Sequence, residues 1–391
     1  MITVTQALEN LFDLVSPLET EDIPLLHAVG RVLARPVAAR LTQPPFAASA
    51  MDGYAIQAAS LPNGRWHVIG EAAAGRGFAG HVGAAQAVRI FTGAPLPAGT
   101  DHVLIQENVE CQADLITLRS GSNNTKAWVR PAGNDFAIGD TICAPRRLTP
   151  RDIALLAAMN IDRITVTRRP EVALISTGDE LIQPGETPGP SQIIASNGYG
   201  LHAMLSAHGA LPRLLPIARD RASSLRMAFE MAKGADLIVT IGGASVGDHD
   251  LVAKVAADIG MQQAFYKVRM RPGKPLMAGR LLGATMIGLP GNPVSAMVCG
   301  EIFLKPVIDH MQGLAAAPRR RLVAPLAHDV PANGEREHYM RGKIEPDGIL
   351  HVYDRQDSAL LGVLQTANAL IIRPPNAPLA QAGDIVKYIT L

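Results

Sequence analysis

The sequence predicts an α/β protein of several domains: a doubly wound, mostly parallel α/β domain joined to two β-rich subdomains, one inserted near the N-terminus and one, a small β-barrel, at the C-terminus. Two observations carry this prediction. Apolar strands alternate with helix-like segments over residues 171–314, which is typical of a doubly wound sheet. Short apolar runs separated by Gly and Pro occupy residues 43–147 and 315–391.

The composition limits the classes of function. Lys and Arg together number 36 and Asp and Glu 35, so the net charge is +1 and no global field attracts nucleic acid or an anionic membrane. Cys111, Cys143 and Cys299 form neither a disulfide framework nor a zinc spacing, which fits a reducing cytoplasm. The N-terminal residues do not read as a signal peptide, and the apolar runs are too short to span a bilayer.

A helical subdomain is expected from residues 1–42 together with residues 148–170. Thr3 and Gln6 have the spacing of a capping box, and the apolar residues after them recur at helical spacing. Thr149 followed by Pro150 predicts a second helix start. We expect these two helices to pack against each other.

The inserted β-rich subdomain, residues 43–147, contains four short apolar runs that read as strands. They are residues 67–69, 87–91, 102–105 and 115–118.

The α/β domain, residues 171–314, contains an ordered series of alternating elements. The expected strands are 172–175, 213–217, 236–241 and 285–289, and the expected helices are 197–208, 222–232, 250–258 and 293–311. Ligands of such sheets bind beyond the carboxyl ends of the strands.

The first candidate site is a glycine turn after residue 241. Gly242 and Gly243 would let the backbone approach an anion closely. Asp248 and Asp250 follow, and paired carboxylates near an anion suggest a hard divalent cation such as Mg²⁺. The alternative is an ordinary tight turn between a strand and a helix.

A basic run and a second glycine turn follow. Lys267, Arg271 and Lys274 lie on a loop stiffened by prolines, the last of them Pro275. These charges could hold an anion, or they could be solvated charges on a hairpin. Gly291 and Asn292 lie between an expected strand and an expected helix, where backbone N–H groups favour anions.

Four further polar residues are ambiguous by themselves. They are Glu180 after the first strand, and Asp52, Thr92 and Asp135 in turns of the β-rich region. For Asp52 an ordinary turn explains the residue as well as a functional role does, and for Glu180, Thr92 and Asp135 an ordinary turn is the better explanation of the residue taken alone. Residues 75–80 match the pattern of a dinucleotide-binding loop, but they lie in the β-rich region without a following helix, so we reject that interpretation.

Taken together, six motifs resemble the molybdopterin molybdenumtransferase family, the MoeA type that shares its fold with the gephyrin E domain. The motifs occur in the family's order and span essentially the whole chain. They are residues 51–55, 92–95, 176–181, 242–250, 271–275 and 288–295. Many relatives have Lys where Arg271 stands, and Arg keeps the charge with a different geometry.

The resemblance implies a function in molybdenum cofactor biosynthesis. The family inserts molybdate into adenylated molybdopterin, with Mg²⁺-dependent cleavage of the phosphoanhydride and release of AMP. It also implies a molybdopterin-binding type of α/β domain and a homodimer in which the β-rich subdomain of one subunit faces the α/β domain of the other. Transient contact with molybdopterin adenylyltransferase is a further expectation.

The resemblance also implies roles for individual residues. Asp250, with Asp248 close by, would ligate the metal, and Ser245, Gly242 and Gly243 would lie near the phosphates. The residues that would hold molybdate or phosphate are Lys267, Arg271, Lys274 and Ser295, within motifs that include Pro275, Gly291 and Asn292. Glu180 and Asp220 would line the pterin and nucleotide cleft. Asp52, Thr92 and Asp135 would come from the partner subunit, and Arg341 and Ser358 would close the cleft.

Two other functions stay open at this point. One is an enzyme like molybdopterin adenylyltransferase, and the other is a non-catalytic scaffold of the gephyrin type. Molybdate and tungstate are similar dianions, and nothing in the loop residues distinguishes them.

Overall fold

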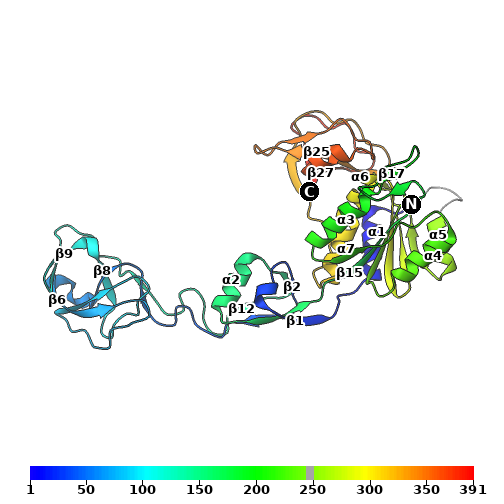
Figure 1. Ribbon diagram of the computed structural model, residues 1–391. Coiled ribbons are helices and arrows are strands. Elements are labelled where there is room, and N and C mark those ends of the chain that lie inside the picture. Colours follow the sequence, from blue (N-terminus) through cyan, green and yellow to red (C-terminus); the bar gives the residue numbers. More distant parts are fainter. Residues whose placement is uncertain (244–250) are drawn as a thin grey trace.

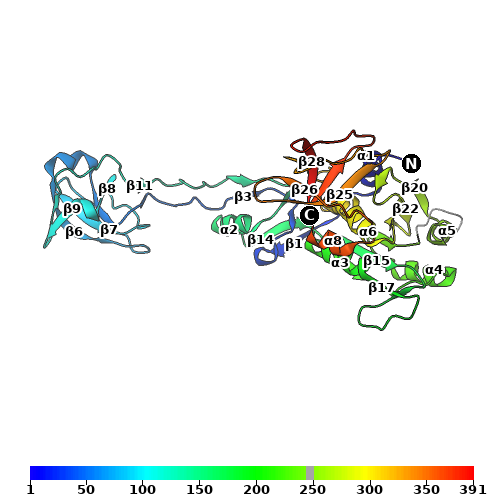
Figure 2. The ribbon, with the colours of Figure 1, turned by 90° about the horizontal axis from the view of Figure 1, so that it is seen from above.

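The protein has an elongated shape in which a distal β-rich region is held away from the main body by a narrow double connection (Figures 1 and 2). A computed structural model describes residues 1–243 and 251–391. The main body contains the α/β domain and the C-terminal β-rich region, and the N-terminal helix lies within it. Across the described residues, no helix is long and apolar enough to cross a membrane.

A six-stranded sheet forms the centre of the α/β domain, in the order β18-β15-β19-β23-β22-β20. The first four strands run parallel, as the sequence predicts, whereas β22 is antiparallel to β23 and β20 is antiparallel to β22. The strands are β15 (Glu171–Ser176), β18 (Leu211–Leu214), β19 (Leu237–Ile241), β20 (Gln262–Tyr266), β22 (Met277–Leu281) and β23 (Ala284–Leu289). The strand expected at 213–217 therefore lies two to three residues earlier.

Helices cover both faces of this sheet, which makes the domain doubly wound. One face packs against α4 (Ala222–Met231) and α5 (Leu251–Asp258). The other face packs against α3 (Ser196–Ala207) and a long helix that begins at Pro293. That long helix, expected over residues 293–311, consists of α6 (Pro293–Cys299), a π-helical turn (Gly300–Leu304) and α7 (Lys305–Met311).

The N-terminal helix α1 (Val4–Leu14) begins with the expected capping box, in which Thr3 and Gln6 bond each other's backbone N–H groups. The prediction that this helix packs against the helix that begins at Pro150 was wrong. The buried face of α1 joins the core of the α/β domain and contacts α7, β20 and β22. The helix α2 (Pro150–Ala158), capped by Thr149 as expected, packs instead in a separate core with the short 3-10 helix η1 (Leu25–His27). The sheet face beside α7 is apolar, and α1 buries its own apolar stripe there.

Two β-sheets precede the α/β domain. The distal sheet lies within residues 43–147, where the Gly- and Pro-punctuated pattern predicts strands, and it contains one parallel pair, Arg65–Ala72 with Gln86–Ile90. The other sheet is antiparallel and forms mainly from residues 1–42 and 148–170, which were expected to be helical. Near the main body, a small sheet has the order β1-β14-β2-β13, with the strands β1 (Thr20–Pro24), β2 (Val32–Leu33), β13 (Arg146–Arg147) and β14 (Arg163–Thr167). The distal six-stranded sheet has the order β8-β5-β7-β6-β10-β9, with the strands β5 (Gly53–Ile56), β6 (Arg65–Ala72), β7 (Gln86–Ile90), β8 (His102–Ile105), β9 (Val109–Gln112) and β10 (Leu115–Leu118).

Two short ladders lie between these sheets, where the chain runs out to the distal region and back. The pairs are β3 (Val37–Ala38) with β12 (Thr141–Ile142), and β4 (Ala48–Ser49) with β11 (Val129–Arg130).

The C-terminal region is a small barrel, and one of its strands comes from the basic loop of the α/β domain. The order is β21-β25-β27-β28-β24, β26 also pairs with β25, and a bridge between Leu326 and Leu350 closes the ring. The elements are β21 (Met270–Arg271), β24 (Leu322–Pro325), β25 (Glu337–Ile344), β26 (Leu350–Val352), β27 (Ala369–Arg373), β28 (Ile385–Thr390) and the helix α8 (Leu361–Thr366). The parallel pairing of β21 with β25 thus ties the basic loop to the barrel.

Candidate active site

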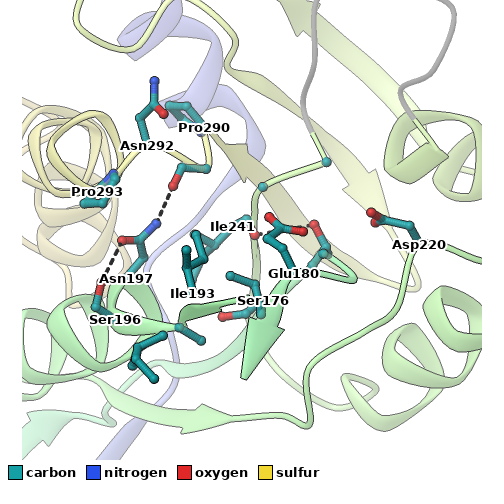
Figure 3. A pocket seen from close by; sticks show the side chains of 18 of the residues that line it. Ser176, Glu180, Ile193, Ser196, Asn197, Asp220, Ile241, Pro290, Asn292 and Pro293 are labelled. Atoms are coloured by element: carbon teal, nitrogen blue, oxygen red, sulfur yellow. Dashed lines mark hydrogen bonds between the residues drawn. The ribbon is translucent and has the colours of Figure 1, made fainter. Parts of the chain in front are cut away.

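A cleft of about 1070 Å³ opens at the carboxyl ends of the parallel strands β15, β19 and β23. Figure 3 shows Glu180 and Asp220 on one side of the cleft and Pro290, Asn292 and Pro293 on another. The sequence-predicted residues that the structure brings together as lining of this cleft are Glu180, Asp220, Gly242, Gly243, Pro275, Gly291 and Asn292.

The glycine turns at the ends of β19 and β23 pack against each other without side chains between them. Gly242 has a φ of +92°, and a Cβ atom placed on it would lie 2.8 Å from the Thr177 carbonyl oxygen. A Cβ atom on Gly291 would lie 3.4 Å from the Cα atom of Gly242. The glycines therefore allow three strand ends to converge at the floor of the cleft.

Arg219 and Asp179 hold together the two loops that carry Glu180 and Asp220. The Arg219 Nη1 atom lies 3.4, 3.1 and 2.9 Å from the carbonyl oxygens of Gly178, Asp179 and Leu181, which surround Glu180 in the chain. The next residue, Asp220, donates its backbone N–H to the Asp179 side chain at 3.1 Å. This arrangement places Glu180 and Asp220 on the same wall.

The second glycine turn links the cleft to the C-terminal barrel region. The Asn197 Nδ2 atom donates to the Gly291 carbonyl oxygen at 2.6 Å, as drawn in Figure 3. Asn292 donates through Nδ2 to the Ser358 hydroxyl at 3.0 Å, and the Val294 N–H donates to the Ser358 carbonyl oxygen at 3.0 Å. Ser358 thus reaches the rim, where its neighbour Ala359 lines the cleft.

The basic loop, residues 267–275, borders the cleft through Pro275, whereas Lys267, Arg271 and Lys274 are not among the lining residues. Backbone bonds hold this loop on two sides. Ile2 bonds Lys267 and Arg269, and the Glu337 N–H donates to the Arg269 carbonyl oxygen. The three cations therefore lie on a braced loop at the flank of the cleft.

Two predicted site residues are buried away from the cleft: Ser295, expected to hold an anion, and Arg341, expected to close the cleft. Ser295 is buried within α6 and does not line the cleft. Arg341 is also buried, and its guanidinium donates to the carbonyl oxygens of Asp357 at 2.7 Å and Arg355 at 3.1 Å. Arg341 therefore holds the turn that carries Ser358.

His338 lies buried next to Arg271, which pairs with it across β21 and β25. Burial, together with the charges of Arg271, Arg336 and Arg341, lowers the pKa of His338 to about 4. Between pH 6.5 and pH 4 an unfolded His takes up a proton that the folded His338 does not. Stability should therefore fall on acidification, and at pH 4.5 this residue should account for a loss of about 2.5 kcal/mol.

Chemical denaturation of the wild type and His338→Gln at pH 7 and pH 4.5 measures this effect. The variant should lose less stability between the two pH values. His27→Gln, at an exposed position far from the barrel, is the matched control. Equal losses in the wild type and His338→Gln would contradict the prediction.

The remaining described site candidates lie far from the cleft of their own chain. Asp52 precedes β5 in the distal sheet, and its Oδ1 atom accepts the backbone N–H and the hydroxyl of Thr92, both at 2.8 Å. These two bonds lower the pKa of Asp52. Asp135 lies in the connecting segment, where its N–H donates to the Gln43 carbonyl oxygen. Asp52 and Thr92 are thus brought together, but not with Glu180.

Three predicted residues, Ser245, Asp248 and Asp250, lie outside the described residues. Within the described residues, no group of three or more His, Cys, Asp or Glu side chains is arranged to hold a metal ion.

Lys254 and Asn197 are among the lining residues that the sequence interpretation missed. Lys254 contributes a cation to the cleft from α5, three residues after Leu251, which also lines it. Residues three apart lie on one face of a helix, and this helix follows the first glycine turn. The sequence alone could therefore have indicated that Lys254 faces the cleft. Asn197 bonds the Gly291 turn across 94 residues of sequence, for which no local pattern exists.

Comparisons with known proteins agree with this architecture. Three family models match consecutive parts of the chain: the MoeA N-terminal region (domain I and II) over residues 2–160, the "Probable molybdopterin binding domain" over residues 173–310, and the MoeA C-terminal region (domain IV) over residues 323–391.

Similar curated and solved proteins cover most or all of the chain. The molybdopterin molybdenumtransferase of Nostoc sp. is 34% identical, covering 100% of this chain and 94% of its own length. The Haemophilus influenzae molybdopterin molybdenumtransferase is 35% identical over 80% of this chain and 78% of its own length. The crystal structure of the molybdopterin biosynthesis MoeA protein from Pyrococcus horikoshii OT3 superimposes with a TM-score of 0.85 at 26% identity and covers 100% of both chains. The chain described here belongs to the molybdopterin molybdenumtransferase (MoeA) family.

Proposed function

We propose that this protein is a transferase of molybdenum cofactor biosynthesis that inserts molybdate into adenylated molybdopterin, with hydrolysis of the phosphoanhydride and release of AMP. The observation that carries this proposal is the cleft at the strand ends. Acidic side chains on one wall, two bare glycine turns on the floor and a basic loop on the flank meet there in a chain of this family. The curated relatives are named molybdopterin molybdenumtransferases.

The residues around the cleft divide the chemistry between them. The cations Lys254, Lys274 and Arg271 attract the anionic substrates, because molybdate and the diphosphate are both negatively charged. Water attacks one of the two phosphorus atoms, and the bridging P–O bond at that phosphorus breaks. AMP keeps the bridging oxygen if water attacks the other phosphorus, and it gains the oxygen of water if its own phosphorus is attacked. The dithiolene sulfur atoms replace one molybdate oxygen, which leaves as water with the two thiol protons, so no oxidant or reductant is consumed.

The acidic wall fits a divalent cation. Mg²⁺ is usually held by one or two carboxylates together with substrate phosphates and water. Asp220 and Glu180, both on the cleft wall, would hold it, with Asp250 and Asp248 proposed from their motif. When bound, Mg²⁺ neutralises charge that develops on the phosphate oxygens. The described residues offer no closed cage, which agrees with an ion shared with the substrate.

We also propose a homodimer in which Asp52, Thr92 and Asp135 complete the cleft of the partner subunit. In one chain these residues lie at the distal sheet and along the connection, away from Glu180 and Asp220 (Figure 2). Their role in the same reaction therefore needs a second chain. The four-subdomain division, a cytoplasmic location and a transient contact with molybdopterin adenylyltransferase remain further parts of this proposal.

AMP release from adenylated molybdopterin tests the proposed function. With Mg²⁺ present, we expect AMP release to increase at least about 10-fold when molybdate is added. The enzyme stabilises the transition state of the coupled reaction fully only when molybdate is bound together with the adenylated substrate. Chelation of the metal with EDTA should abolish AMP release, and excess Mg²⁺ should restore it. Tungstate in place of molybdate compares the two oxyanions.

Other outcomes of this assay contradict the proposal. ATP turnover with unmodified molybdopterin would indicate an adenylyltransferase. No release under any condition, with intact folding, would indicate a scaffold of the gephyrin type.

A further inference from the structure

Residues 20–167 form an arm that carries the distal sheet away from the main body (Figure 1). The chain enters and leaves the arm at neighbouring points, because Thr20 and Thr167 are partners in the pairing of β1 with β14. Just outside the arm, the Arg168 N–H donates to the Glu19 carbonyl oxygen at 2.9 Å. The two crossings therefore form a narrow two-stranded connection, and a few residues of this kind can act as a hinge.

Arg168 anchors the two crossings to the main body. Its Nη1 and Nη2 atoms each lie 2.6 Å from a carboxylate oxygen of Asp236, and its Nε atom lies 2.7 Å from the Glu19 carboxylate. These bonds lie at the hinge itself, so a rotation of the arm about the hinge barely stretches them. Only a contact at some distance from the crossings can fix the angle of the arm.

The strand β13, at the edge of the small sheet, makes a contact of this kind. It lies two strand intervals from β14, which corresponds to about 10 Å. Arg147 of β13 donates through Nη2 to the Asp309 Oδ1 atom of α7 at 2.8 Å. Among the described residues, this is the one ion pair that joins the arm to the main body. We call this ion pair the clamp.

Both partners of the clamp are held in place by further bonds. The Asp309 Oδ1 atom also accepts a bond from the His208 Nε2 atom at 2.8 Å. Buried Gln312 donates to the His208 carbonyl oxygen at 3.3 Å, and Arg147 donates through Nη1 to the Gly30 carbonyl oxygen at 2.9 Å. Burial opposes ionisation of Asp309, but the bonds from His208 and Arg147 outweigh it and lower the pKa of Asp309. The clamp is therefore a preorganised contact between two charged groups.

We propose that Arg147 and Asp309 are positioning residues of the reaction. Their ion pair fixes the angle at which the arm leaves the main body, and this angle places Asp52 and Thr92 in the cleft of the partner subunit. The inference rests on the function and the homodimer proposed above. The distal sheet lies far along the arm from the clamp, so a small rotation at the hinge displaces Asp52 strongly (Figure 2). A displacement of about 1 Å at reacting groups can lower a rate about 100-fold.

Two neighbouring arginines of β13 provide a matched pair of probes. Arg147 pairs with Asp309 across the hinge. The Arg146 Nη2 atom lies 2.7 Å from the Asp152 Oδ1 atom, and both of these residues belong to the arm. Arg147→Gln and Arg146→Gln remove the same charge from the same strand, but only the first breaks a contact between the arm and the main body.

Spin labels measure the angle of the arm without any need for activity. The labels sit on exposed Cys143, between β12 and β13, and on Met227→Cys at an exposed position of α4. Cys111→Ser removes the other exposed thiol, and refolding with excess unlabelled chain leaves one labelled chain in each dimer. We expect Arg147→Gln to broaden the distribution of distances between the labels about 2-fold, because the hinge is then free to rotate. Arg146→Gln should leave it unchanged.

Asp309→Asn removes the charge from the other side of the clamp and keeps the test decisive if Arg147→Gln fails to fold. It should broaden the same distribution. An unchanged distribution in both variants would overturn the inference. This measurement involves no substrate, so its result holds whatever reaction the protein catalyses.

Mixed dimers distinguish positioning in the partner's cleft from a general structural role. Asp220→Asn is expected to inactivate the cleft of its own chain, so in a mixed dimer its arm serves the native cleft of a wild-type chain. An equal mixture with the wild type, refolded together, should keep about half of the wild-type AMP release. Adding Arg147→Gln to the Asp220→Asn chain should lower this to about one quarter, because the wild-type cleft in the mixed dimer then lacks a positioned arm. Adding Arg146→Gln instead should leave it at about half.

The outcomes separate this inference from the proposed function. If the chain with both Asp220→Asn and Arg147→Gln still gives about half of the wild-type release, the clamp has no effect on the partner's cleft and the inference is wrong. If the wild type releases no AMP while Arg147→Gln broadens the label distances, the proposed function fails and the clamp still fixes the arm. If the wild type releases AMP with molybdate and Arg147→Gln changes neither measurement, the inference fails alone.

Discussion

Replacing Asp220 with Asn is expected to lower molybdate-dependent AMP release at least about 100-fold, with the fold intact. Asp220 lines the cleft opposite the second glycine turn, and its N–H group donates to the Asp179 side chain, a bond that the substitution preserves. The change removes only the negative charge that would hold a metal at the phosphates. Steady-state kinetics over a range of Mg²⁺ concentrations measures the loss. Asp258→Asn, at an ion-paired surface carboxylate of α5, is the matched control and should keep wild-type activity.

Mixing this variant with Asp52→Asn tests the dimer at the same time. In the proposed arrangement one of the two clefts of a hybrid dimer contains both native carboxylates. An equal mixture of the two inactive proteins, unfolded and refolded together, should therefore recover about one quarter of wild-type activity. No recovery, with hybrid dimers present, would show that the distal sheet does not complete a partner's cleft. Wild-type activity of Asp220→Asn alone would remove Asp220 from the site.

Gly242→Ala should destabilise the protein by about 3 kcal/mol and reduce turnover by about 100-fold. Two effects add here. The left-handed backbone at a φ of +92° costs a side chain about 1 kcal/mol, and the new methyl group would approach the Thr177 carbonyl oxygen to 2.8 Å. Backbone atoms cannot move aside easily, so the turn must shift and carry the floor of the cleft with it. Thermal or denaturant unfolding and AMP release measure the two consequences.

Gly234→Ala separates the backbone cost from the close approach. Gly234 has a φ of +82°, and a Cβ atom there would meet nothing within 4 Å. That variant should lose only about 1 kcal/mol and keep its activity. If Gly242→Ala behaves like Gly234→Ala, the contact among the three strand ends is unimportant and this account of the turn is wrong.

Local patterns predicted most elements of the fold, because they act within a few residues. The capping box at Thr3 starts α1, and the Thr149 cap followed by Pro150 starts α2, as expected. The alternation of apolar runs predicted β15, β19 and β23 and the helices between them. The strands β20 and β22 were missed, because a short amphipathic strand at a sheet edge has a weak pattern and the prolines between them suggested a loop.

Local patterns also predicted part of the candidate site. Residues directly after predicted strands, such as Glu180, Gly242 and Gly291, meet in the cleft because the carboxyl ends of parallel strands share one edge. Arg341 was expected to close the cleft, but its guanidinium donates to carbonyl oxygens of its own chain, and only the folded barrel shows that. Asn197 and Lys254 became visible only once helices were placed against the cleft.

The sequence by itself determined the fold class, the family and the strand ends at which the chemistry had to lie, since periodicity, caps and glycine turns are local properties of the chain. Tertiary structure decided which distant segments meet. It placed α1 on the α/β core rather than on α2, joined the basic loop to the barrel through β21 and β25, and put Asp52 and Thr92 far from the cleft of their own subunit. Such contacts depend on which apolar surfaces bury each other across hundreds of residues, and no local pattern records that choice.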